Sequence, residues 1–326
     1  MKHNYKLDGF GYRLRPIKLS DAQFVIDTRL EDMERNKFVH PISRDINVQE
    51  EWLKTYFKRE GDYYFIIENR FTGESEGLIS FYDEQDGKAE WGRWVVKKGS
   101  LSAPESVYLL YRIAFEQVGL NELYCRTISD NINVVSFHTS IGEKLRVVHE
   151  KLFELNGNMF DATEQYSDKE HFYNNIAPML EKRSKMVADR NFKRLVGKFE
   201  FHHIGVATKN IEKEFESYSL MGYKKEDMVF EDKEQGIKGQ FIENNQMPRL
   251  ELLENLEGYH TLDKQLEKNQ KLYHTAYYVD NIDKAVEVFK LNRAKIISPL
   301  KQSVYFGKRI CFLMLPNMDM IELLER

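Results

Sequence analysis

Cysteine, proline and long apolar runs are all scarce in this 326-residue sequence. Its two cysteines, Cys125 and Cys311, lie in separate apolar, strand-like segments, which argues against a disulfide framework or a cluster of thiolate metal ligands. Seven prolines and 18 dispersed glycines exclude a collagen-like or low-complexity chain. No segment approaches the roughly 18 apolar residues that a membrane-spanning helix needs. We therefore expect a conventionally packed cytoplasmic protein with no membrane partner.

A basic surface is lacking as well. The net charge is −4 at pH 7, and no stripe of lysine and arginine provides the footprint that nucleic-acid phosphates require. The hydrophobic fraction of 42% and the charged fraction of 31% are those of an ordinary globular protein, and the length predicts two or three domains. Small molecules are therefore the expected partners.

Strand and helix patterns alternate in the amino-terminal half. Apolar and β-branched runs bounded by polar turns predict strands, and Gly119 and Gly142 mark the ends of two predicted helices. The predicted strands are 64–69, 77–82, 89–97 and 123–128, and the predicted helices are 107–118 and 134–141. Apolar residues at helical spacing from Phe172 to Leu180 predict a linking helix. The predicted division is a first domain over 1–166, a linking helix over 167–198 and a second domain over 199–326.

The second domain contains an internal repeat with a constant offset of 71 residues. The equivalent pairs are His203 and His274, Asn210 and Asn281, and Glu251 and Glu322. Each copy reads as a strand, a helix (211–221 or 282–291) and further strands that end in Glu-Leu-Leu-Glu, so the predicted unit is βαβββ. One register held at separate anchors indicates a duplication, and the two copies are expected to pair their sheets.

This duplication predicts a metal site. In each copy the histidine opens the first strand and the glutamate lies on the last, so one sheet face can present both. A single strand histidine or glutamate is more often an ordinary core or surface residue, but two copies bring four side chains around one centre. The predicted ligands are His203, Glu251, His274 and Glu322. This donor set favours Mn, Co, Ni, Fe or Zn as a Lewis acid for an enolate or a bound oxygen. His202 is expected to point to the opposite face.

These motifs carry a family resemblance across 199–326. They are Phe201-His-His-Ile-Gly-Val-Ala, Leu250-Glu-Leu-Leu-Glu-Asn, Tyr273-His-Thr-Ala-Tyr-Tyr-Val-Asp-Asn-Ile, Gly307-Lys-Arg-Ile-Cys-Phe-Leu and Met320-Ile-Glu-Leu. This segment resembles the vicinal oxygen chelate superfamily, most closely methylmalonyl-CoA epimerase and glyoxalase-like proteins. The resemblance implies a paired βαβββ cup with the metal at its floor. Epimerases carry a basic glutamate on a middle strand of the first module, whereas 237–242 offers no carboxylate before Glu243.

A loop in the first domain could hold a phosphate. The strand that ends near Lys97 is followed by Lys-Gly-Ser-Leu-Ser-Ala-Pro-Glu105, which places free backbone N–H groups and a helix start together. Most such loops are merely turns. The strand over 123–128 is, however, followed by Ser129-Asp-Asn131 and a helix that ends at Gly142. This order resembles the GNAT acyl-CoA N-acetyltransferases over residues 10–155.

The GNAT resemblance implies acetyl-CoA as cofactor and a mixed sheet with flanking helices, so the fold expected for the whole chain is α+β. It implies cofactor contacts from Val96, Lys97, Lys98, Gly99, Ser100, Leu101, Ser102, Ala103 and Asn131. His138 takes the place of the family's tyrosine that protonates the leaving thiolate, and Glu90 could act through water as the base. Leu101 departs from the family's second glycine, and Val96 from its usual Arg or Gln.

Substrate choice rests on the opening segments Phe38-Val-His-Pro-Ile-Ser, Glu51-Trp-Leu-Lys-Thr-Tyr-Phe and Tyr63-Tyr-Phe-Ile-Ile-Glu. They resemble amino-sugar N-acetyltransferases and also ribosomal-protein acetyltransferases. We favour a bifunctional enzyme that acetylates a nucleotide-linked amino sugar and carries a metal-dependent isomerase or lyase as its second domain. The alternatives are a non-catalytic ligand-binding second domain and a protein or peptide N-acetyltransferase. A homodimer is also expected.

Overall fold

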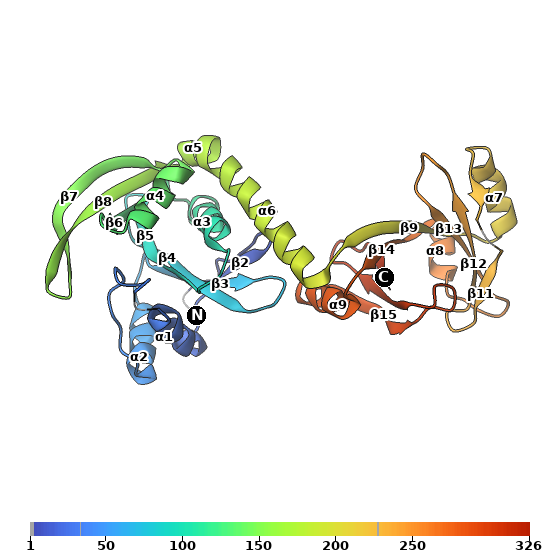
Figure 1. Ribbon diagram of the computed structural model, residues 1–326, viewed down its shortest axis with the longest axis horizontal. Helices are drawn as coiled ribbons and strands as arrows, with labels where there is room; N and C mark the ends of the chain where they lie inside the picture. The colour runs from blue at the N-terminus through green and yellow to red at the C-terminus, as the bar shows by residue number, and fades with distance from the viewer. Residues whose placement is uncertain (1–2, 33, 227) are drawn as a thin grey trace. The chain divides into compact units, whose positions relative to one another are not determined.

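The computed structural model describes residues 3–32, 34–226 and 228–326 and divides into two compact units, Met1–Asn191 and Phe192–Arg326. The division falls inside helix α6 (Ala177–Val196), within the segment predicted to link the domains (Figure 1). The exact predicted boundaries, 166/167 and 198/199, stay a prediction. No helix among the described residues is long and apolar enough to cross a bilayer.

The first unit is built on a mixed sheet of eight strands in the order β1-β2-β3-β4-β5-β6-β8-β7. Among the described strands of this sheet, only β5 and β6 pair in parallel, and the other neighbours are antiparallel. The strands are β1 (Leu7–Asp8), β2 (Tyr12–Pro16), β3 (Tyr63–Asn69), β4 (Ser75–Gln85), β5 (Lys88–Val96), β6 (Glu122–Ile128), β7 (Lys144–Leu155) and β8 (Asn158–Asp168). The predicted mixed sheet is confirmed.

Helices of the first unit supply its core against this sheet. They are α1 (Ala22–Leu30), α2 (Ile46–Tyr56), α3 (Ala103–Arg112), α4 (Ile132–Ile141), α5 (Lys169–His171) and α6, with π-helical turns over Ile113–Val118 and Phe172–Ile176. Helix α3 begins after Ser102, has Pro104 in its first turn and continues through a π-helical turn to Gly119, whose φ of 89° is in the left-handed region that favours glycine. The helix predicted to start at 102–105, with Pro104 in its first turn, and to stop at Gly119 is therefore present.

The β7–β8 hairpin was not predicted. It forms the long curved green arm of Figure 1 and packs along β6 through β8. Nearly all of β7 is exposed, so its sequence shows no alternation between a buried and a solvated face. Periodicity cannot reveal a strand that buries neither face.

The second unit is a sheet of nine strands that contains the duplication. The core order is β10-β12-β13-β9-β14-β17-β16-β15, with β11 paired to β12. The elements are β9 (Phe199–Ala207), α7 (Ile211–Ser219), β10 (Lys224–Lys225), β11 (Phe230–Asp232), β12 (Ile237–Glu243), β13 (Leu250–Asn255), α8 (Asp263–Glu267), β14 (Leu272–Val279), α9 (Ile282–Leu291), β15 (Lys295–Gln302), β16 (Arg309–Met314) and β17 (Met320–Glu325).

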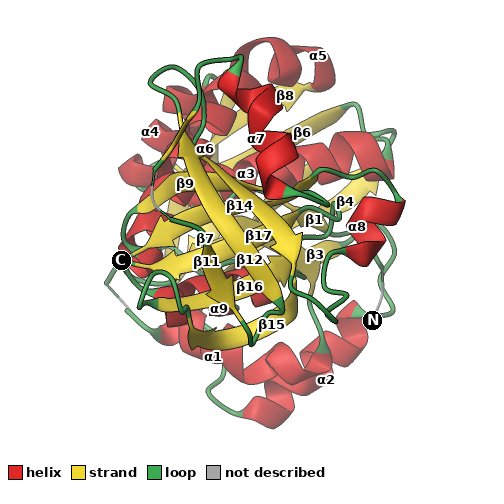
Figure 2. Cartoon of the chain, turned by 90° about the vertical axis from the view of Figure 1, so that its right-hand side faces the viewer, coloured by secondary structure: helices red, strands yellow, loops and turns green. Residues whose placement is uncertain are grey.

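Both copies of the repeat have the same pairing. In each, the first strand runs parallel to the last (β9 with β13, β14 with β17), and the copies join through antiparallel β9 and β14, which lie side by side in Figure 2. Asn210 and Asn281 cap the equivalent helices by accepting from the backbone N–H three residues on, at 2.9 and 3.0 Å. The α+β expectation with paired βαβββ modules is confirmed, although the first copy splits one strand into β10 and β11.

Candidate functional sites

A cavity of about 480 Å³ opens in the first unit where β5 and β6 separate. Their pairing ends at Glu90 and Tyr124, and the residues that follow on both strands line the cavity. A register shift in the β4–β5 pairing places a β-bulge around Arg93, whose φ is 46°. The bulge and the early end of the pairing create the opening.

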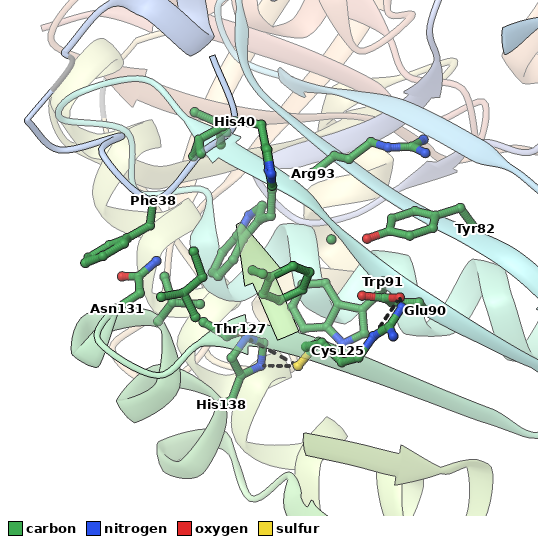
Figure 3. A pocket seen from close by; sticks show the side chains of 18 of the residues that line it. Phe38, His40, Tyr82, Glu90, Trp91, Arg93, Cys125, Thr127, Asn131 and His138 are labelled. Atoms are coloured by element: carbon green, nitrogen blue, oxygen red, sulfur yellow. Dashed lines mark hydrogen bonds and ion pairs between the residues drawn. The ribbon is translucent and has the colours of Figure 1, made fainter. Parts of the chain in front are cut away.

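This cavity brings together Glu90, Asn131 and His138 (Figure 3). Glu90 lies on β5, is buried and contacts the Arg126 guanidinium, with Nε 3.1 Å from Oε2. Asn131 is the N-cap residue of α4, but its side chain makes no capping hydrogen bond. His138 comes from α4 and is also buried. The elements therefore converge as the GNAT resemblance implies, and the roles of these residues stay predictions.

Two buried residues that the sequence analysis did not single out hold His138 in place. Nδ1 of His138 lies 2.9 Å from Oε2 of Glu143, and the Tyr111 hydroxyl donates to Oε1 of the same carboxylate at 2.6 Å. Cys125 lies against both His138 and Glu143, and burial and the charge of Glu143 raise the pKa of its thiol well above the ordinary value. Glu143 directly follows a helix-ending glycine, where a solvated residue is the usual expectation, so only its five-residue spacing from His138 could have revealed it.

The predicted phosphate loop, 96–103, lies where β5 ends and α3 begins. Gly99 has a φ of 81° and open space around it, which suits close approach of a ligand. The Lys98 N–H donates to Oε2 of Glu31 at 2.9 Å, so a carboxylate already accepts from this loop. Lys97 and Glu31 line a second cavity of about 290 Å³. A diphosphate bound at the Lys98 N–H would displace Glu31, and the cofactor contacts of this loop stay a prediction.

The second unit brings the four predicted metal ligands together. His203 lies on β9, Glu251 on β13, His274 on β14 and Glu322 on β17, which are the four central strands. From Nε2 of His203, the separations are 3.1 Å to Glu251, 3.1 Å to His274 and 3.5 Å to Glu322. Nε2 of His274 lies 3.5 Å from Glu251 and 3.4 Å from Glu322.

These separations fit one divalent ion. With bonds of about 2.1 Å, neighbouring ligand atoms lie about 3.4 Å apart in tetrahedral geometry and about 3.0 Å apart in octahedral geometry. All four side chains are buried, and Nδ1 of His274 has no hydrogen-bond partner among the described residues. Burial raises the pKa of Glu251 to about 7, although the charges of His274 and Arg249 act in the opposite direction. The donor set therefore accommodates a metal, and the ligand roles stay predictions.

A glycine makes room for the second histidine. Gly205 pairs with Glu251 on one side and with His274 on the other, and a Cβ there would lie 2.2 Å from Cε1 of the His274 ring. The equivalent position 71 residues on is Ala276, which pairs with His203 and Glu322. The two copies thus share one pairing scheme around the centre, but only the first needs glycine.

His202 was expected to point to the face opposite His203, and this expectation is wrong. The two Nδ1 atoms lie 2.8 Å apart, because the β9–β14 register shifts between the pairs Phe201–Tyr277 and His203–Ala276 and leaves His202 in a bulge. Nε2 of His202 also lies 2.6 Å from Arg249. Burial lowers the pKa of both histidines to about 3, so both are neutral, and neutral imidazole is the form that binds metal.

A small cavity of about 20 Å³ adjoins Glu251, His274 and Glu322, and it contains a carboxylate that the sequence analysis missed. Asp232, at the end of β11, is buried and accepts from the backbone and side-chain amides of Gln235 at 2.9 and 2.8 Å. Glu243, the first carboxylate after 237–242, is exposed at the end of β12. The buried base candidate therefore lies one strand earlier than 237–242.

Known family models match both halves of the chain and agree with the two family resemblances expected from the sequence. Residues 12–144 match the family model of the acetyltransferase (GNAT) domain, and residues 202–312 match that of the glyoxalase/bleomycin resistance protein/dioxygenase superfamily. No curated protein matches the chain significantly.

Solved structures similar to this chain cover about half of it. FdhC, a nucleotide-linked sugar GNAT, is 24% identical over 56% of this chain and 99% of its own, with a TM-score of 0.47. An acetyltransferase from T. thermophilus is 23% identical over 56% and 97%, with a TM-score of 0.48. The spermidine N-acetyltransferase SpeG from Vibrio cholerae is 15% identical over 50% and 97%, with a TM-score of 0.45.

Proposed function

Because this chain joins a GNAT acetyltransferase domain to a glyoxalase-type domain, we propose that it is a bifunctional enzyme. The first unit would transfer an acetyl group from acetyl-CoA to the amine of a nucleotide-linked amino sugar. The second would perform metal-dependent isomerase or lyase chemistry. The observation that carries the first half is the shared cavity of Glu90, Asn131 and His138, which come from separate elements.

In the proposed transfer, the amine nitrogen attacks the acetyl carbonyl carbon, a C–N bond forms and the C–S bond breaks. Glu90 accepts the amine proton through water, and His138 donates a proton to the departing CoA thiolate. Glu143 orients the imidazole through Nδ1 and leaves Nε2 for the thiolate. The loop over 96–103 would hold the diphosphate, with Asn131 against the cofactor arm.

The chemistry of the cavity supports a hydroxyl-rich amine as acceptor. Its wall carries Arg29, Tyr82, Asp83, Arg93 and Thr127, so donors and acceptors of both charges are available. A volume of about 480 Å³ is within the range of small-ligand sites. The likeness of the opening segments to amino-sugar acetyltransferases adds to this support. A peptide amine is the alternative that remains from the sequence.

Thiol release from acetyl-CoA with nucleotide amino sugars, spermidine and peptides as acceptors tests this half. We expect Glu90→Gln and His138→Phe to lower kcat by about 100-fold or more, the usual effect of removing a general acid or base. Glu60→Gln changes an exposed glutamate and is the matched control. Unchanged rates for both variants would remove both assignments, and release with peptides alone would favour the alternative.

For the second unit, Asp232 supports turnover over mere ligand binding, because it adds a base candidate to the cavity beside the four ligands. A divalent ion bound there would supply Lewis-acid stabilisation of an enolate or a bound oxygen. Elemental analysis tests the site: we expect His274→Ala to contain about one metal ion per chain less than the wild type. Equal metal content in the two proteins would exclude His274 as a ligand.

We also propose a homodimer through β7. This strand pairs with β8 alone among the described strands and exposes Leu145, Val147 and Val148 along its outer part. Antiparallel pairing with a second copy would satisfy the outer backbone groups of β7 and bring these apolar side chains against those of the second copy. Light scattering should give twice the chain mass for the wild type and for Met186→Glu, an exposed site on α6, but the chain mass for Val148→Glu. A wild-type monomer would refute the dimer.

A further inference from the structure

Cys125, His138 and Glu143 form a compact buried cluster beside the acetyl-transfer cavity. Their side chains come from β6, α4 and the residue just before β7, and their donor atoms all lie within 4.8 Å of one another. Sγ of Cys125 is 3.6 Å from Nδ1 of His138 and 3.6 Å from Oε2 of Glu143, and the same Nδ1 is 2.9 Å from that oxygen. Thiol, imidazole and carboxylate therefore converge on one point.

This triangle differs from a nucleophile relay. In a relay the imidazole lies between thiol and carboxylate and contacts them through opposite nitrogens. Here the Glu143 oxygen contacts both the thiol and the imidazole. Three donors in mutual contact are the arrangement of a metal site.

The separations match those around a tetrahedral zinc ion. Bonds of about 2.3 Å to sulfur and about 2.0 Å to nitrogen or oxygen place sulfur about 3.5 Å from its neighbours and nitrogen about 3.3 Å from oxygen. Both sulfur separations, 3.6 Å to Nδ1 and 3.6 Å to Oε2, agree, and the separation of 2.9 Å between Nδ1 and Oε2 needs to open by about 0.4 Å.

The surroundings supply what such a site needs besides ligands. Tyr111 donates to Oε1 of Glu143 at 2.6 Å, which fixes the carboxylate and leaves Oε2 for the ion. Trp91 packs edge-on against the His138 ring, with centroids 4.9 Å apart. Cys125 and His138 line the cavity of about 480 Å³, so an ion has an entry path and an open position beside solvent.

We propose that Cys125, His138 and Glu143 bind a zinc-class divalent ion, at a centre distinct from the one in the second unit. Thiolate, imidazole and carboxylate donors together select zinc or cobalt over magnesium or calcium. An ion bound to Nδ1 of His138 takes the place of the hydrogen bond through which Glu143 orients the imidazole, so zinc inhibits acetyl transfer. This inhibition rests on the proposed function, whereas the binding does not.

Cobalt titration of the full-length, metal-free protein tests the binding. A thiolate-to-cobalt charge-transfer band arises only from cobalt bound to sulfur, and the chain has two cysteines. We expect the band in the wild type and in Cys311→Ser, and its loss in Cys125→Ser. Cys311 is the matched control, because it is buried in the second unit against the Ser298 carbonyl. His274→Ala should keep the band while binding less cobalt.

A band absent from the wild type, or persisting in folded Cys125→Ser, overturns the site. Glu143→Gln provides a second variant, in which cobalt affinity should fall at least tenfold. Acetyl transfer by the wild type and Cys311→Ser should fall with added zinc, and that by Cys125→Ser should lose this sensitivity. A band with zinc-insensitive acetyl transfer overturns the inhibition while the site stands. If neither the wild type nor any variant transfers acetyl groups, the proposed function is refuted, and the cobalt result alone decides the metal site.

Discussion

Replacing Gly205 with alanine should weaken metal binding without changing any ligand. The added Cβ would lie 2.2 Å from Cε1, 2.4 Å from Nδ1 and 2.8 Å from Nε2 of His274. Carbon contacts need about 3.5 Å, so the ring must move by about 1 Å. Metal–ligand distances tolerate only about 0.2 Å, so His274 could no longer reach the ion. We expect affinity to fall by about 10- to 100-fold or more, which is about 1.4–2.8 kcal/mol.

Competition of the protein against a chromogenic chelator for zinc or cobalt measures this affinity. Ala276→Gly is the matched control, because it exchanges the same two residue types at the equivalent position of the other copy. It removes a methyl group instead of adding one, so the ligands keep their places and affinity should stay close to that of the wild type. Thermal unfolding of the metal-free proteins shows whether each variant is folded.

One result would refute this reasoning. If folded Gly205→Ala binds metal with the stoichiometry and affinity of the wild type, the His274 ring either does not lie against Gly205 or does not bind the ion. The four-ligand centre would then be wrong, even if the protein contains metal elsewhere.

Three further predictions concern the first unit. Glu31→Ala removes the carboxylate that accepts from the Lys98 N–H, so the KM for acetyl-CoA should fall several-fold in steady-state kinetics. A higher KM would contradict the binding of the acetyl-CoA diphosphate by this loop. Glu143→Gln should lower kcat about tenfold or more and shift the pH profile of kcat. An unchanged pH profile would contradict the orientation of the His138 imidazole by Glu143. Burial raises the pKa of Glu105 from 4.5 to about 7, so the folded state holds this proton more tightly than the unfolded state. The free energy of unfolding should therefore decrease between pH 4.5 and 7, by up to about 3 kcal/mol. Denaturant unfolding of Glu105→Gln at pH 5 and 8 should lack that part of the slope, and an unchanged slope would refute the assignment.

Much of the fold could be predicted because it leaves periodic or duplicated traces in the sequence. The 71-residue offset determines which strands are equivalent, and this offset alone was enough to predict that His203, Glu251, His274 and Glu322 lie together. Glycine stops after α3 and α4 marked those helices in the same way. Such signals are local or repeated, so one sequence is sufficient to find them.

What could not be predicted depends on register and on contacts between distant segments. The bulge that turns His202 toward His203 arises from a shift in the β9–β14 pairing, which no pattern within β9 reveals. Glu143 and Asp232 look like solvated residues in the sequence and become buried through contacts with other elements. The strand β7 is exposed on both faces, so its sequence lacks the alternation of apolar and polar residues that predicts a strand.

The seam between β9 and β14 makes the two modules of the second unit mutually dependent. One module contributes His203 and Glu251 and the other His274 and Glu322, so an ion bound by all four would crosslink the two halves across this strand pair. Its binding free energy adds to folding only when both halves are docked. A single module would therefore retain at most half of the proposed site, and the metal concentration would set the cooperativity with which the unit unfolds.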